Sequence, residues 1–169
     1  KNISNFKVSN AGYNFSLDEW IRLRFAEKFL DQSFFTSSRR ALNKIFKAAM
    51  DDKKHLLAVR TFRLLLANYE KSGSISRAFD QAVELFTEFL LVEDLVAYEL
   101  KGLISDVTMV SLRSGQLATG RNALFMLKRQ IENMVDSHGA DSRTSRVLNE
   151  IDLGIGTLSA TLVGGKESS

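Results

Sequence analysis

The chain of 169 residues contains no proline, and this absence constrains its fold more than any other feature of the sequence. Proline usually makes up about 5% of residues, and it interrupts helices because it lacks an amide hydrogen and clashes with the preceding turn. Apolar residues recur here at helical spacing, and glycine and serine separate the resulting segments. The sequence therefore predicts an all-α fold, a compact multi-helix bundle of six to eight amphipathic helices.

Three segments are expected along the chain. Residues 1–15 form an N-terminal arm that contains apolar side chains among its Asn and Ser residues. Residues 16–163 form a single helical bundle domain, and residues 164–169 form a flexible C-terminal tail. The arm is expected to dock either on the core of its own chain or on a neighbouring subunit.

Capping residues and apolar spacing predict where the helices begin and which faces are buried. The first helix is expected to begin at Ser16, in a capping box with Glu19, and to end near Gln32. Either Ser37 or Ser38 is expected to cap the second helix. The inner faces predicted for the first and fourth helices consist, respectively, of Leu17, Trp20, Ile21, Phe25 and Phe29, and of Phe79, Ala82, Val83, Phe86, Phe89 and Leu90.

The third helix is expected to be the most buried element. It runs from about Asp52 to Ser72, stops at Gly73, and is apolar nearly all round, which is typical of a helix in the middle of a bundle. Near the end of the chain, Asp141 is expected to cap the last helix.

Residue types that carry catalysis or bind metals are sparse in this sequence. The chain has no cysteine, which excludes disulfides, thiolate zinc sites and cysteine nucleophiles. Its two histidines, His55 and His138, stand in no metal-ligand spacing, and no G-x-S-x-G nucleophile elbow is present. We therefore expect a non-enzymatic protein with no catalytic residues, no metal and no cofactor.

The sequence contains no N-terminal charged and apolar leader and no uninterrupted apolar run of about 18 residues. We expect a soluble protein with no signal peptide in this chain and no transmembrane segment. The absence of cysteine suits any compartment, so the sequence leaves the cellular location open.

Charge is distributed unevenly along the chain. Residues 37–74 hold nine basic and three acidic side chains, a net charge of +6, whereas residues 75–106 hold two basic and seven acidic side chains, a net charge of −5. Helical spacing predicts a basic ridge on the second and third helices and an acidic ridge on the fourth. The basic ridge consists of Arg40, Lys44, Lys47, Arg60 and Arg63, and the acidic ridge consists of Asp80, Glu84 and Glu88.

Three functions are compatible with this pattern. The first is an interaction or assembly protein that self-associates by pairing its basic ridge with the acidic ridge of another copy, or that binds another protein. The second is a helical RNA- or DNA-binding protein, such as a viral nucleocapsid or coat subunit, in which the basic helical hairpin contacts phosphates. The third is an effector or chaperone-like adaptor that binds a partner helix in an apolar groove.

Overall fold

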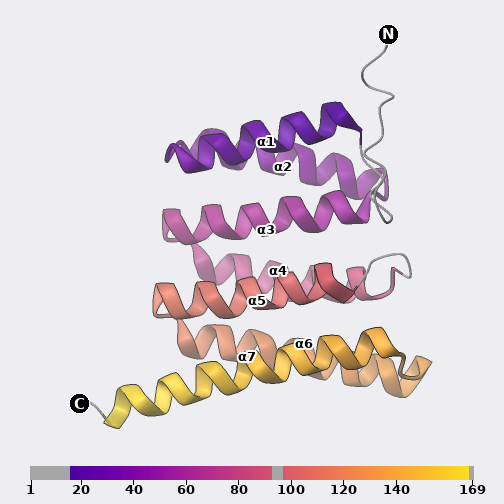
Figure 1. The fold of residues 1–169 in the computed structure, drawn as a ribbon, viewed down its shortest axis with the longest axis vertical. Helices are drawn as coiled ribbons and strands as arrows, with labels where there is room; N and C mark the ends of the chain where they lie inside the picture. The colour runs from indigo at the N-terminus through magenta and orange to yellow at the C-terminus, as the bar shows by residue number, and fades with distance from the viewer. Residues whose placement is uncertain (1–15, 93–96, 168–169) are drawn as a thin grey trace. The chain divides into compact units, whose positions relative to one another are not determined.

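The structure is a computed structural model, and it describes residues 16–92 and 97–167. Within these ranges the chain forms seven α-helices and no β-strand, so the predicted all-α fold is confirmed (Figure 1). The predicted arm, residues 1–15, lies outside the described residues. The helices are α1 (Leu17–Asp31), α2 (Phe35–Asp51), α3 (His55–Ser72), α4 (Ile75–Leu90), α5 (Ala97–Ser114), α6 (Leu117–His138) and α7 (Ser142–Glu167).

The chain divides into two compact units, which we call unit 1 (Lys1–Gly73) and unit 2 (Ser74–Ser169). The division follows the end of α3, where Gly73 has a φ of 81° and its amide donates to the carbonyl of Glu70 over 3.3 Å. This left-handed conformation favours glycine, because a β-carbon would be strained there. A single domain over residues 16–163 remains a prediction.

In unit 1, α2 packs against both α1 and α3 (Figure 1). Toward α1, the Ser38 hydroxyl donates to the Ala26 carbonyl over 3.2 Å. Toward α3, the rings of Phe46 and Phe62 lie 6.1 Å apart, and Phe62 has no exposed surface. The core of this unit is therefore built on the two flanks of α2.

The prediction that a serine caps α2 is wrong. The helix begins at Phe35, so Ser37 and Ser38 lie inside its first turns, and the Ser38 side chain is fully buried. The Ser38 hydroxyl donates a hydrogen bond to the Ala26 carbonyl of α1, so it links two helices and does not cap the end of one.

In unit 2, α5 and α7 lie side by side, and α4 and α6 lie side by side behind them (Figure 1). The close approach of α5 and α6 depends on Gly120, because a β-carbon there would lie 1.8 Å from the Ser111 hydroxyl oxygen. All six residues of the inner face predicted for α4 are buried, namely Phe79, Ala82, Val83, Phe86, Phe89 and Leu90.

The last helix is capped as predicted. A carboxylate oxygen of Asp141 accepts hydrogen bonds from the amide and the hydroxyl of Thr144, each over 2.7 Å, and these bonds lower the pKa of Asp141. Helix α7 then continues through Gly164 and Gly165 to Glu167, inside the segment that we predicted to be a flexible tail.

Candidate binding surfaces

Helix α1 carries two apolar stripes. Leu23, Ala26 and Leu30 are buried, whereas the second stripe is exposed: 41% of Ile21, 59% of Phe25 and 38% of Phe29. The predicted inner face of α1 is therefore wrong at its three exposed members. Helix α2 contacts α1 at Ala26, which is fully buried and whose carbonyl accepts the Ser38 hydrogen bond, whereas Phe25 and Phe29 remain exposed beside this contact.

Helical spacing alone does not show which of the two apolar stripes of α1 is buried. A helix that packs on one side needs a single apolar stripe. The residues Leu23, Ala26 and Leu30 already satisfy the i, i+3, i+7 spacing, so a second stripe at i, i+4, i+8 is the sequence signal that could have pointed to a binding surface.

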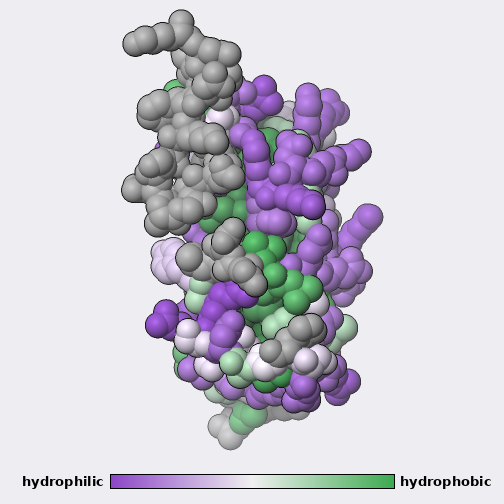
Figure 2. Space-filling view, turned by 90° about the vertical axis from the view of Figure 1, so that its right-hand side faces the viewer, coloured by the Kyte–Doolittle hydropathy of each residue, from purple (hydrophilic) through white to green (hydrophobic). Residues whose placement is uncertain are grey.

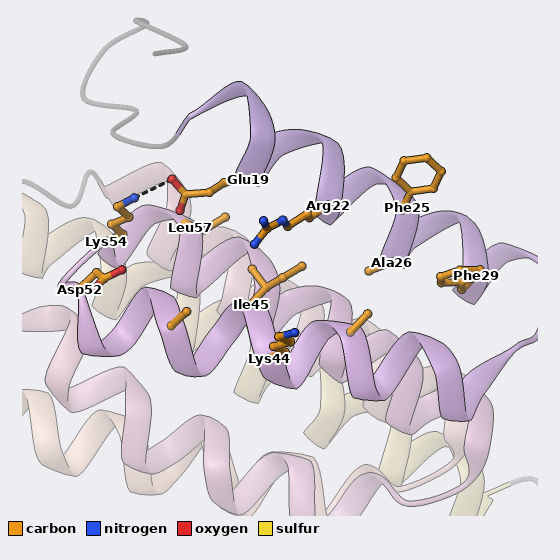
Figure 3. A pocket seen from close by; sticks show the side chains of 12 residues that line it. Glu19, Arg22, Phe25, Ala26, Phe29, Lys44, Ile45, Asp52, Lys54 and Leu57 are labelled. Atoms are coloured by element: carbon orange, nitrogen blue, oxygen red, sulfur yellow. Dashed lines mark hydrogen bonds and ion pairs between the residues drawn. The ribbon is translucent and has the colours of Figure 1, made fainter. Parts of the chain in front are cut away.

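A groove of about 500 Å³ lies between α1 and α2 (Figure 3). Its apolar lining combines the exposed aromatic side chains of α1 with small and aliphatic side chains of α2 and one buried leucine of α3. The lining residues are Glu19, Arg22, Phe25, Ala26, Phe29, Ala41, Lys44, Ile45, Ala48, Asp52, Lys54 and Leu57.

One end of the groove is held by the first turn of α1. Ser16 and Glu19 form the predicted capping box, and the Glu19 carboxylate also accepts a hydrogen bond from Lys54 Nζ over 2.6 Å (Figure 3). Burial raises the pKa of Glu19, but the hydrogen bonds from Lys54 and Ser16 outweigh it and leave the pKa below its usual value of 4.5. The Glu19–Lys54 ion pair therefore lies at this end of the groove.

Two basic side chains line the groove away from this ion pair. Figure 3 shows Arg22 and Lys44 near its middle, one from each helix. The guanidinium of Arg22 pairs with Asp18 over 2.9 Å at the surface, whereas Lys44 forms no ion pair with any residue that the structure describes. Lys44 is therefore available to a carboxylate of a partner.

A shallow depression on the outer side of α1 continues this surface. It is lined by Trp20, Ile21, Arg24, Phe25 and Lys28, so Phe25 belongs to both the depression and the groove. The Arg24 guanidinium lies 5.6 Å from the Trp20 ring centroid, in cation–π contact. Aromatic and basic groups thus alternate over α1.

The predicted basic ridge is exposed on α2 but not on α3. Arg40, Lys44 and Lys47 share the outer face of α2, where all three are exposed, whereas Arg60 and Arg63 on α3 are half-buried. On the face drawn in Figure 2, hydrophilic side chains cover much of the surface over α1 to α3. The accessible ridge is therefore the α2 part, and Lys44 joins it to the groove.

The predicted acidic ridge lies on α4. Asp80, Glu84 and Glu88 are exposed and follow one another at successive turns, opposite the buried aromatic face of the helix. Within the two described ranges of the chain, none of the three forms an ion pair. Three neighbouring carboxylates on one helix repel one another by a few tenths of a kcal/mol per pair, so a basic partner would relieve them.

The charge of the chain divides at the same point as its structure. Unit 1 holds fourteen basic and seven acidic side chains, a net charge of +7, and unit 2 holds nine basic and thirteen acidic side chains, a net charge of −4. The uneven charge is therefore a difference between two compact units.

Clustered carboxylates or histidines and buried hydroxyls are the groups that could bind a metal or support catalysis. Among the described residues, no group of three His, Cys, Asp or Glu side chains could hold a metal ion. Several buried hydroxyls have structural partners: Thr61 donates to the Leu57 carbonyl over 2.6 Å, and Ser111 donates to the Val107 carbonyl over the same distance. Each of these bonds joins a hydroxyl to the carbonyl one turn earlier in the same helix, α3 or α5.

Comparison of the chain with protein-family models, with curated proteins and with solved structures finds no match in any of the three. Of the helices in the described ranges, none has both the length and the apolar composition that crossing a bilayer requires.

Proposed function

We propose that this chain is a non-enzymatic assembly protein that self-associates by pairing the α2 ridge of one copy with the α4 ridge of another. The observation that supports the proposal is the exposure of two ridges of opposite charge on separate compact units. Such pairing joins different surfaces of the two copies, so it is heterologous and leads to rings or filaments.

The two ridges match in length. Lys47 lies seven positions after Arg40 on α2, and Glu88 lies eight positions after Asp80 on α4, so at a rise of 1.5 Å per residue the ridges are roughly 10 and 12 Å long. Exposed ion pairs contribute only about 0–1 kcal/mol each, so the ridges would set orientation and association rate, and added salt would weaken the contact.

Charge reversal tests this pairing. We expect that Glu84→Lys with Glu88→Lys, and separately Arg40→Glu with Lys47→Glu, each shift the protein to its 19.0 kDa monomer in 0.05 M salt, because like charges then face each other. The two double variants mixed together should associate again, since each supplies one unaltered ridge. Light scattering coupled to size exclusion measures the mass.

The matched control is Glu132→Lys with Asp136→Lys, two exposed carboxylates one turn apart on α6, which should leave association unchanged. A wild-type monomer in 0.05 M salt, or an assembly equally stable in 0.5 M salt, would contradict the proposal. A high 260/280 nm absorbance ratio that falls as salt rises would favour nucleic-acid binding by the basic residues.

A further inference from the structure

The groove between α1 and α2 has the length of a short helix. Its α2 wall runs from Ala41 to Asp52, which at 1.5 Å per residue is roughly 16 Å, or about three turns. Among its lining residues, Ala26 and Leu57 are buried, whereas Phe25 and Phe29 extend from α1 beside it (Figure 3). Three anchors of an amphipathic helix at i, i+4 and i+7 would fit this length.

The exposed apolar stripe of α1 is unusual for a surface that faces only water. Single exposed apolar side chains are ordinary, but Ile21, Phe25 and Phe29 are exposed on three successive turns of α1. The volume of about 500 Å³ lies within the range of about 300–1,000 Å³ found for binding pockets. The groove is therefore large enough for several apolar side chains of a partner.

Charge identifies what kind of helix would fit. Toward the middle of the groove the polar lining residues are basic, Arg22 and Lys44, and Arg40 lies one turn from Lys44 on the exposed face of α2. The acidic lining residues, Glu19 and Asp52, lie at one end, where Lys54 binds Glu19. A helix with carboxylates beside its apolar face would complement this charge.

Two segments of this chain can be compared with the helix that the groove would accept. Residues 1–15 contain two lysines and no carboxylate. The acidic helix α4 has its apolar face buried within the fold, including Phe79, Phe86 and Phe89. Neither segment combines carboxylates with an unburied apolar face, so the charge and the apolar lining of the groove favour a segment of a different protein.

We infer that the α1–α2 groove binds an acidic amphipathic α-helix of a partner protein. Three large apolar side chains of that helix enter between Phe25, Phe29 and Ile45, and a flanking carboxylate pairs with Lys44. This binding does not require the self-association proposed above, since it leaves α4 unused, although both proposals assign a carboxylate partner to Lys44.

Two synthetic peptides test the inference on the full chain. Each is an 18-residue helix with leucines at i, i+4 and i+7; one has glutamates beside this stripe and the other has lysines. Fluorescence anisotropy in 0.15 M salt, where the Debye length is about 8 Å, measures binding. We expect the glutamate peptide to bind at least tenfold more tightly than the lysine peptide.

Protein variants locate the site. Phe25→Ala should weaken binding of the glutamate peptide at least tenfold, whereas Phe34→Ala, at an equally exposed phenylalanine outside the groove, should change it less than twofold. Lys44→Glu should reverse the preference between the peptides, whereas Lys47→Glu, one turn away and outside the groove, should preserve it. Both phenylalanines are largely exposed, so the folded state tolerates either change.

Three results with the two synthetic peptides would overturn the inference. They are equal binding of the two peptides, the same effect of Phe25→Ala and Phe34→Ala, and no binding of either peptide at millimolar concentration. Tighter binding of a peptide of residues 1–15 would also overturn it, because it would assign the groove to the N-terminal segment of this chain. Loss of self-association in the α4 variants would leave peptide binding intact, so the two proposals fail separately.

Discussion

At the scale of single residues, phenylalanines of the same chain have opposite roles. Phe62 has no exposed surface and packs against Phe46, whereas Phe25 is 59% exposed beside the groove. Helical spacing predicted the buried state of Phe86 correctly, because α4 has one clear apolar face. It failed for Phe25, because α1 has two apolar stripes and spacing cannot decide which one meets α2.

Replacing Phe62 with alanine should lower the free energy of unfolding by about 3–5 kcal/mol, because the change removes a fully buried ring and leaves a cavity. Urea denaturation followed by circular dichroism measures the loss. Phe34→Ala is the control, since 56% of that side chain is already exposed, and its effect should stay within about 0.5 kcal/mol. A loss below about 1 kcal/mol at Phe62 would show that the site is not a packed core.

The Glu19 carboxylate should make stability depend on pH. Its pKa is held below 4.5 in the folded state, so its contribution is present above pH 4.5 and is lost as the pH falls through the lowered pKa. Glu19→Gln keeps the capping-box hydrogen bond but removes the charge, and should cost about 1 kcal/mol at pH 7.

Urea unfolding of wild type and Glu19→Gln at pH 7 and at pH 3 checks this expectation, and the difference between the two proteins should shrink at pH 3. Glu27→Gln is the matched control, because Glu27 pairs with Arg24 over 3.3 Å on the exposed side of the same helix. A difference that is the same at both pH values would show that the charge of Glu19 contributes nothing.

At the scale of helices, ends were predictable where a residue bonds within its own helix. The Ser16–Glu19 capping box, the Asp141 cap and the glycine end of α3 are all present, because each depends on neighbours in sequence. The predicted capping role of Ser38 was wrong because the hydrogen-bond partner of this serine, the Ala26 carbonyl, belongs to another helix. The groove was unpredictable for the same reason, since its walls come from two helices and its Leu57 from a third.

Gly120→Ala should destabilise unit 2 although alanine favours helices. The added β-carbon would meet the Ser111 hydroxyl oxygen at 1.8 Å and the Ser111 β-carbon at 2.6 Å, so α5 and α6 would have to separate, at a cost of about 1–3 kcal/mol. Gly156→Ala in α7 is the control. A β-carbon there has no atom within 4 Å, so this change should stabilise by up to about 1 kcal/mol.

Thermal melts measure the change in stability of each variant relative to wild type. The change should be a loss for Gly120→Ala and a gain for Gly156→Ala. Equal stabilisation by both substitutions would show that α5 and α6 do not approach as closely at Gly120 as the structure indicates. The sign is the decisive quantity, because helix propensity alone predicts that both variants are more stable than wild type.

At the scale of the whole molecule, the sequence predicted the helical class and the separation of charge more completely than the binding surface. The sequence shows that the net charge of the chain changes from positive to negative near residue 74. The structure places the boundary between the two compact units at the same position. The predicted basic ridge combined α2 and α3, yet Arg60 and Arg63 are half-buried. Their burial depends on tertiary packing, which charge counts along a sequence do not contain.

The division at Gly73 also bears on the order in which the two units can fold during synthesis. The contacts that shape unit 1 lie within the first 73 residues, so this unit can fold while the ribosome is still making the rest of the chain. At roughly 5–20 residues per second, synthesis of residues 74–169 takes about 5–20 seconds. During that interval the exposed apolar stripe of α1 is already displayed, so the proposed binding at the α1–α2 groove would not need the acidic helix α4.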